Sequence, residues 1–302
     1  MDKLRAMAAF VHIVEKGSLT AAAEALGTSP PSTVRALAAL ERALGVRLLN
    51  RTTRRIALTD EGRAYYERAR RILADVADAE AAASTKQAVP QGRLAIGAPV
   101  MFGRLHVAPL VAEFVDRHPE IKVELLLMDR VVNLVEEGLD ATLRIGALAD
   151  SSLVALEVGR TRRVVCASPA CLKRHGVPRV PADLARRPCI RFTGLASGEW
   201  EFKASGKPVR VRVDGPIATN QVDAAIDACL QGLGYGMFLC YQVGAHQRAG
   251  RLRYVLEAYE PEPAPVSLVY PQARLVSARL RAFIDWIVPR LRARLRGADV
   301  RK

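Results

Sequence analysis

The sequence has little of what marks a membrane, secreted or disulfide-linked protein. It contains no run of eighteen or more apolar residues, so no membrane-spanning helix is expected. Its first residues, Met1–Arg5, lack the apolar segment of a signal peptide. The five cysteines are odd in number and have no Cys-x-x-Cys spacing, which favours buried reduced thiols over a disulfide framework. We therefore expect a cytoplasmic protein with no metal and no other cofactor.

Motifs for catalysis are also missing. There is no Gly-x-Ser-x-Gly elbow and no His-Glu-x-x-His zinc motif. Gly232, Gly234 and Gly236 resemble a nucleotide-binding loop, but they follow a predicted helix and precede a predicted strand, the reverse of the order that such a loop needs. Adjacent carboxylates such as Glu136 and Glu137 diverge on a helix and do not face one substrate. We therefore expect no enzymatic activity.

What the chain has in excess is positive charge. Its 302 residues carry a formal net charge of +14, and the pI is about 10.1. Half of the residues are hydrophobic, so a chain of this length can bury the cores of one large or two to three smaller domains. The charge favours a polyanionic partner, although a basic surface can also be only a solvated one.

The stretch Gly17–Glu41 predicts two short helices that meet at a tight turn. The first has Ser18 as its N-cap and ends at Gly27, a residue type that tolerates the left-handed conformation. The second has Ser29 as its N-cap and Pro30 at the first helical position, where a missing N–H costs nothing. Two small helices joined by a glycine-bearing turn are typical of a helix-turn-helix motif, although many helical proteins share this pattern.

The charges around this motif favour DNA binding. Between Thr28 and Thr59 the only acid is Glu41. The same stretch contains six arginines, namely Arg35, Arg42, Arg47, Arg51, Arg54 and Arg55. A surface that binds DNA phosphates needs such a local excess.

A small hairpin is predicted after this motif. Apolar residues at 46–49 and 56–58 flank a polar run at 50–55, as in two short strands around a turn. Beside a helix-turn-helix motif, such a hairpin is a wing whose arginines reach the DNA backbone or the minor groove. An ordinary charged turn is the alternative interpretation.

A long helix follows, with Thr59 as its N-cap, and continues to about Lys86. Apolar residues recur along it at spacings of four and three, in the pattern of a helix-pairing seam. They are Tyr65, Ala69, Ile72, Val76, Ala79 and Ala83. The pattern by itself fits a dimer seam and a packing stripe against the same domain equally well. Val89–Gly92 then breaks the helix and marks a domain boundary.

From Arg93 onward, predicted strands and helices alternate, which indicates α/β domains with mostly parallel sheets. Ligands of such folds bind beyond the carboxyl ends of the strands. The turn Gly97–Gly103 lies at such a place, between a predicted strand and a helix predicted over Arg104–His118. Its free backbone N–H groups are therefore candidates for holding an anion.

Nearly the whole chain resembles a LysR-type transcriptional regulator. The most specific matches are Gly17–Ala23, Leu26–Ser32, Leu44–Arg51 and Leu58–Gly62. Softer matches lie further along, at 94–99, 144–146, 166–169, 277–279 and 283–285. A periplasmic solute-binding protein is the rival interpretation of the second half, and the basic N-terminal module argues against it.

The resemblance implies an α/β fold class with an N-terminal winged helix-turn-helix, a long linker helix and a two-lobed effector-binding domain similar to periplasmic binding proteins. The implied bounds are 1–59 for the DNA-binding domain, 60–89 for the linker or dimerisation helix and 90–302 for the effector-binding domain. Within the last, lobe 1 covers about 93–161 and 267–302, and lobe 2 about 162–266. The chain would cross between the lobes near Gly159–Arg163 and Pro263–Ser267.

The resemblance also implies functional residues. The expected DNA-binding residues are Ser29, Pro30, Pro31, Ser32, Val34, Arg35, Arg51, Thr52, Arg54 and Arg55. The expected effector-binding residues are Pro99, Val100, Met101, Phe102, Arg144, Phe192, Thr193, Thr219, Asn220 and Gln221. It decides the ambiguous seam in favour of dimerisation through Tyr65, Ala69, Ile72, Val76 and Ala79.

The implied function is control of transcription through promoter DNA, modulated by a small organic effector. The implied partners are double-stranded promoter DNA, the effector, further copies of the chain in a dimer or tetramer, and RNA polymerase, with no membrane. The sequence departs from the family pattern at Thr33, where an apolar residue is usual, and at Val34, where a serine is usual. It also departs at Met101, where many members have a hydroxyl that can hold an effector carboxylate.

Overall fold

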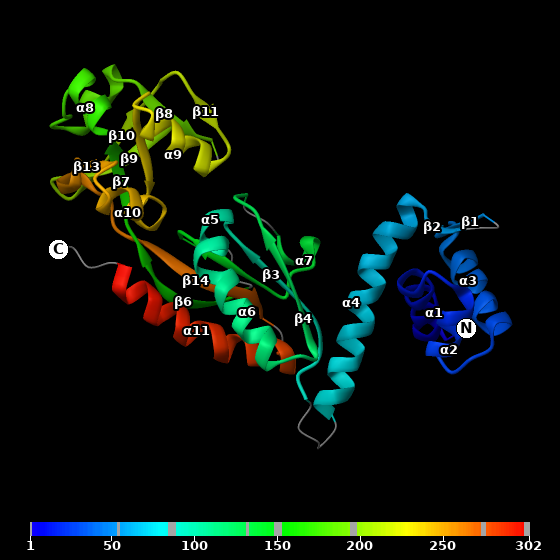
Figure 1. Ribbon diagram of the computed structural model, residues 1–302. Helices are drawn as coiled ribbons and strands as arrows, with labels where there is room; N and C mark the ends of the chain where they lie inside the picture. The colour runs from blue at the N-terminus through cyan, green and yellow to red at the C-terminus, as the bar shows by residue number, and fades with distance from the viewer. Residues whose placement is uncertain are drawn as a thin grey trace. The chain divides into compact units, whose positions relative to one another are not determined.

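The computed structural model describes residues 2–52, 55–83, 89–130, 133–147, 153–193, 198–272 and 276–298 (Figure 1). The chain divides into two compact units, and the division falls between Gly92 and Arg93. Each unit is described by itself.

The first unit consists of helices and a small hairpin. Its elements are α1 (Lys3–Lys16), α2 (Leu19–Ala25), α3 (Pro30–Leu44), β1 (Leu49–Thr52), β2 (Arg55–Leu58) and α4 (Asp60–Ala83). The first three helices each begin at a side-chain cap, because Asp2, Ser18 and Ser29 accept a hydrogen bond from a backbone N–H of the first turn. Gly27 has a φ of +59°, which explains why a glycine stands at the turn between α2 and α3.

One hydrophobic core holds this unit together. Phe10 and Ile13 of α1 are fully buried against Leu37 and Leu40 of α3. The hairpin joins the core through Leu49 of β1 and through Leu48 just before it. The start of α4 approaches the same backbone so closely that a Cβ at position 62 would lie 1.9 Å from the carbonyl oxygen of Leu48. Only glycine fits there.

The first lobe of the second unit is built on a five-stranded sheet in the order β4-β3-β5-β14-β6. The strands are β3 (Gly92–Ala98), β4 (Ile121–Leu127), β5 (Ala141–Ile145), β6 (Leu153–Thr161) and β14 (Ala264–Pro271). The helices are α5 (Val100–Phe102), a π-helical turn (Gly103–Val107), α6 (Ala108–Arg117), α7 (Leu134–Glu137) and α11 (Ala278–Ala298). α6 packs against α11, where the Trp286 indole N–H donates to the Leu110 carbonyl at 3.1 Å (Figure 1).

The second lobe has a sheet in the order β11-β8-β12-β7-β13 and a separate hairpin. The sheet strands are β7 (Arg163–Ala167), β8 (Cys189–Phe192), β11 (Ala218–Thr219), β12 (Tyr235–Leu239) and β13 (Arg253–Val255). The hairpin is β9 (Glu199–Ala204) with β10 (Lys207–Arg212). The helices are α8 (Pro169–His175), α9 (Val222–Leu230) and α10 (Cys240–Arg248), with 3-10 turns at Pro181–Arg186 and Glu257–Tyr259.

The sheets are mixed, which corrects the expectation of mostly parallel ones. β14 is antiparallel to β5 and β6, and β12 is antiparallel to β7. The reason is the chain path. β6 leads directly into β7 of the other lobe, and β14 returns alongside β6, with Ala264 opposite Thr161. The two connections between the lobes therefore run as one paired ribbon.

The helix predicted to begin at Arg104 begins earlier, at Val100, because Met101 and Phe102 bury their side chains when this segment is helical. The Gly103 N–H consequently donates to the Pro99 carbonyl at 2.7 Å. The Val100 N–H donates to Asp129 Oδ1 at 3.0 Å. Two N–H groups of the predicted anion-binding turn are thus already bonded within the protein.

Among the described residues, none of the helices combines the length and the apolar character that a membrane span needs.

Candidate functional site

The first turn of α3 presents its polar residues outward. Ser29, Pro30, Pro31 and Arg35 are exposed. Ser32 and Val34 are partly buried. The Ser29 hydroxyl accepts from the Ser32 N–H at 3.4 Å, which fixes the beginning of the helix. The side chains expected to meet DNA therefore lie together at one end of α3.

Thr33 departs from the family pattern, and its surroundings explain how the protein accommodates a hydroxyl there. The side chain is buried, with 2% of its surface exposed. Its Oγ1 lies 3.0 Å from the hydroxyl of Thr28 and donates to the Ser29 carbonyl at 3.3 Å. A buried hydroxyl with two partners avoids the cost of an unsatisfied polar group.

Glu41, the acid in the basic stretch, is bonded to the wing. Its Oε1 accepts from the backbone N–H groups of Leu48 at 2.9 Å and Leu49 at 3.3 Å. The carboxylate thus holds the start of β1 against α3. This bonding gives Glu41 a structural role and joins α3 to the wing.

The wing itself is only partly described. β1 and β2 pair antiparallel, with Arg51 opposite Ile56 and Thr52 opposite Arg55. This backbone is the hairpin that the sequence predicts. The side chains of Arg51, Thr52 and Arg55, and all of Arg54, lie outside the described residues, so their roles stay predictions.

The predicted dimer seam of α4 is divided between two surroundings. Ala69 is fully buried in the core of its own unit, and the ring of Tyr65 lies 5.8 Å from that of Phe10. Ile72, by contrast, exposes 41% of its surface, and Val76 is partly buried. The side chain of Ala79 lies outside the described residues.

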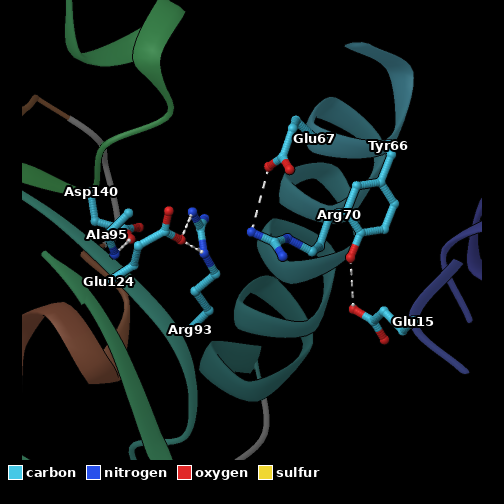
Figure 2. Close-up of polar contacts among 8 residues, drawn as sticks. All are labelled: Glu15, Tyr66, Glu67, Arg70, Arg93, Ala95, Glu124 and Asp140. Atoms are coloured by element: carbon cyan, nitrogen blue, oxygen red, sulfur yellow. Dashed lines mark hydrogen bonds and ion pairs between the residues drawn. The ribbon is translucent and has the colours of Figure 1, made fainter. Parts of the chain in front are cut away.

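Polar contacts reinforce the packing of α4 on α1. The Tyr66 hydroxyl of α4 donates to Glu15 Oε1 of α1 at 3.4 Å (Figure 2). Within α4 itself, Arg70 pairs with Glu67 at 3.5 Å (Figure 2). The first turns of α4 are therefore part of the DNA-binding unit, and the helix becomes more exposed beyond them.

The effector residues expected from lobe 1 lie at the carboxyl end of its sheet. β3 and β5 are parallel, with Gly97 opposite Thr142, so Pro99 and Arg144 follow at the same end. Asp140 fastens β5 to β3, because its carboxylate accepts from the Ala95 N–H at 2.7 Å (Figure 2). Figure 2 also shows Arg93 on β3 paired with Glu124 on β4.

Met101 and Phe102 are not open to solvent in this conformation. Met101 exposes 7% of its surface and belongs to the hydrophobic cluster of lobe 2, together with Ile190, Val222 and Phe238. Phe102 is fully buried. Met101, which belongs to lobe 1 in the chain, is thus packed against the core of lobe 2.

The effector residues expected from lobe 2 are brought together by two parallel strands. Thr219 of β11 lies opposite Phe192 of β8, and the Thr193 N–H donates to the Thr219 carbonyl at 2.8 Å. The Thr219 hydroxyl accepts from the Gln221 N–H at 3.1 Å, at the start of α9. Asn220 is exposed between them.

Three further residues link the lobes. The ring of Tyr241, in the first turn of α10, lies 5.4 Å from those of Phe102 and His106 in edge-to-face contact. Arg104 pairs with Asp223 of α9 at 3.3 Å. Tyr241, His106 and Asp223 were not among the residues expected from the sequence. Tyr241 and Asp223 each lie in a first helical turn just after a strand, the signal that could have found them.

Two polar atoms near this contact are buried without a hydrogen-bond partner among the described residues, Asp129 Oδ2 and His106 Nε2. Burial lowers the pKa of His106, and the positive charge of Arg294 lowers it further. Burial raises the pKa of Tyr241. At neutral pH both rings are therefore uncharged, as their packing requires.

The described residues contain no group of three or more His, Cys, Asp and Glu side chains arranged to hold a metal ion. All five cysteines are free thiols, and only Cys240 is even partly exposed. Burial raises the pKa of Cys171 to about 11 and that of Cys189 to about 12. Thiols in such surroundings are poor nucleophiles.

Comparisons with known proteins decide the family. Residues 4–63 match the model for the bacterial regulatory helix-turn-helix protein of the lysR family, and residues 87–292 match the LysR substrate binding domain. The chain belongs to the LysR family. It is a transcriptional regulator with a helix-turn-helix DNA-binding domain and an effector-binding domain, which confirms the family, fold class and function predicted from the sequence.

The relatives of this LysR-type regulator match over almost their whole length. An HTH-type transcriptional repressor of Pseudomonas aeruginosa is 37% identical over 95% of this chain and 92% of that protein. The regulator DmlR of Escherichia coli is 34% identical over 92% and 91%. Among solved structures, CrgA of Neisseria meningitidis has a TM-score of 0.60 at 33% identity, covering 95% of this chain and 98% of that one.

Proposed function

We propose that this LysR-type regulator reads its promoter with the first turns of α3 and holds the DNA backbone with its wing. The observation that carries the proposal is the exposed N-terminal end of α3 with its arginine, Arg35. Arg35 is exposed there beside Ser29 and Pro31, and Glu41 is bonded to the wing. The N-terminal residues of recognition helices meet base edges in the major groove.

Arg35→Ala tests this proposal. The variant should weaken binding to the promoter of the chain's own gene by roughly 1–3 kcal/mol and relax base preference. The measurement is a fluorescence anisotropy titration against that promoter and a shuffled duplex of equal length. Arg68→Ala, which removes an exposed arginine of α4, is the matched control. Unchanged discrimination between the two duplexes by Arg35→Ala would sink the assignment.

The structure supports a narrower dimer seam than the sequence pattern. Tyr65 and Ala69 pack in their own unit, so the exposed Ile72 and its neighbour Val76 are the proposed contact between two copies. Ile72→Glu places a charge in that apolar contact and should yield monomers in analytical ultracentrifugation. Ala77→Glu puts the same charge on an exposed position of α4 and should stay dimeric. Equal dimerisation of both variants would move the interface elsewhere.

The proposed effector is a small, partly apolar organic molecule that binds between the lobes. Pro99, Arg144, Thr219 and Asn220 lie at the strand ends where such ligands bind. Because Met101 is buried in the lobe 2 cluster, the effector must displace it or pack against it.

A thermal-shift screen of small acids and neutral compounds tests the effector proposal, because a ligand of the native state raises the melting temperature. Met101→Ser and Asn220→Ala should change the affinity of any hit. Hits whose affinity neither variant alters would place the effector site outside this cleft.

The remaining proposals follow from the family. The regulator acts in the cytoplasm as a dimer or tetramer and contacts RNA polymerase at the promoter. The proposed domains are 1–59, 60–89 and 90–302. The structure adds that the first turns of the linker helix pack with the DNA-binding domain.

A further inference from the structure

A hollow lies between α3 and α1. It measures about 80 Å³. Arg5 and Ala9 of α1 form one wall, and Ser32, Thr33 and Ala36 of α3 form the other. Leu26 and Thr28, from the turn between α2 and α3, close one end. Two of the lining residues, Ala9 and Ala36, have small side chains.

Arg5 is the single charged residue of this lining. Its side chain is exposed, and no hydrogen bond or ion pair joins its guanidinium to any of the described residues. The nearby acid, Asp2, accepts from the backbone N–H of Arg5 at 3.2 Å as the N-cap of α1. The Arg5 backbone is therefore fixed by the cap, while its positive charge is left for a partner.

The other polar groups of the lining offer neutral contacts. The hydroxyls of Thr28 and Thr33 lie 3.0 Å apart, and their protons go to protein acceptors, because Thr33 donates to the Ser29 carbonyl and Thr28 to the Ala23 carbonyl. Ser32 contributes its hydroxyl and stands in the first turn of α3. No carboxylate lines the hollow. A guanidinium and the hydroxyl of Ser32, with no carboxylate among the lining residues, suit an anion such as a phosphate diester.

We infer that this hollow seats a backbone phosphate of the promoter and that Arg5 is a DNA-contacting residue outside the helix-turn-helix motif. The inference rests on the proposed reading of DNA by α3. If the first turn of α3 enters the major groove, the groove is flanked by two sugar-phosphate strands. The wing holds one flank, and Arg5 meets the other from α1. Phosphate contacts on both flanks would fix the register of the base-reading residues.

Salt dependence of DNA binding tests the inference. Each phosphate that a cation neutralises contributes about 0.9 to the slope of log Kobs against log salt concentration. Arg5→Ala should therefore flatten the slope by about 0.9 per protomer and weaken binding about tenfold at low salt. The loss should be equal for the promoter of the chain's own gene and for a shuffled duplex, because a phosphate carries no base information.

Three comparisons keep the experiment decisive. Arg5→Lys should retain the slope, Arg68→Ala should match the wild type, and Arg5→Gln replaces Arg5→Ala if the far-UV circular dichroism melt shows that the alanine variant is unfolded. A wild-type slope for Arg5→Ala or Arg5→Gln overturns the inference, as does a loss confined to the promoter. Arg35→Ala separates this inference from the proposed function. If Arg35→Ala loses discrimination between the two duplexes while Arg5→Ala keeps the wild-type slope, base reading by α3 is supported and only the phosphate site in the hollow is rejected.

Discussion

The two units differ in how their charge is arranged. Residues 1–92 contain 14 lysines and arginines against 10 acids, whereas residues 93–302 contain 31 against 21. The larger positive surplus thus lies in the effector unit, yet the DNA-binding motif lies in the first. What distinguishes the first unit is a local excess of positive charge. Six arginines lie between Thr28 and Thr59, and Glu41, the acid of that stretch, is bonded to backbone N–H groups. The net charge of the chain indicates the class of its partner, whereas the distribution of the charges along the chain indicates which surface binds that partner.

The two units also differ in how they are held together. The first unit has one core and a cap at the start of each of its first three helices. The second has separate hydrophobic clusters, and its lobes meet through Met101, a ring contact of Tyr241 and the exposed pair of Arg104 with Asp223. We expect the first unit to respond to mutation as one body. The contact between the lobes should yield to milder changes, as the proposed effector site requires.

Gly62→Ala should show the largest difference between the units. Its Cβ would collide with the Leu48 carbonyl, so the first unit should lose about 3 kcal/mol of unfolding free energy. Both tryptophans, Trp200 and Trp286, lie in the second unit. The urea midpoint measured by far-UV circular dichroism should therefore fall, while the midpoint measured by tryptophan fluorescence should stay the same.

Gly244→Ala is the matched control in α10. Its Cβ would meet only the flexible end of Arg248, at 3.3 Å, so the second unit should gain about 0.5–1 kcal/mol from helix propensity. If both variants moved the two signals together, the units would not unfold separately.

Glu41→Ala should have an intermediate effect, limited to the first unit. Removing the carboxylate leaves the N–H groups of Leu48 and Leu49 without their acceptor, which should cost about 2 kcal/mol. Promoter affinity should fall as well, because the wing loses its anchor on α3. Glu24→Ala, at an exposed position of α2, should change neither quantity. A melt of Glu41→Ala that matches the wild type would show that water replaces the carboxylate.

Mild acid should have the smallest effect and should act on the second unit. The pKa of His106 lies below its ordinary value because burial disfavours the imidazolium, so the unfolded chain binds a proton more readily. The unfolding free energy of the second unit therefore keeps its full value above the ordinary histidine pKa of about 6.5 and decreases as the pH falls below it. Melts followed by tryptophan fluorescence between pH 8 and pH 5 should show the loss.

His106→Phe should make this pH dependence shallower, because it keeps the ring against Tyr241 and removes the titration. His246 has a pKa lowered mainly by burial, so His246→Gln should flatten the profile too. A profile that His106→Phe leaves untouched would assign the acid sensitivity to other groups.

Much of the fold could be predicted because its signals are local. Ser18, Ser29 and Thr59 cap their helices as their sequence positions indicate. β4, β7, β8 and β12 coincide with the apolar runs of the sequence. The strand β6 was not predicted, although it begins with the apolar residues 153–156. The hairpin β9–β10 gave a weaker signal, because charged residues recur along both of its strands. The antiparallel return of β14 could not be read either, since strand direction depends on the path of the whole chain.

The candidate sites divide in the same way. The sequence by itself determined the helix-turn-helix, its caps, its basic surroundings and the family, because each depends on residues a few positions apart. Only the tertiary structure decided that Ala69 is buried in the core of its own unit while Ile72 stays exposed. Only it placed Met101 in the cluster of the other lobe, and Arg5 beside Ser32. These contacts join residues far apart in the chain, and no local pattern of side chains encodes which of them will meet.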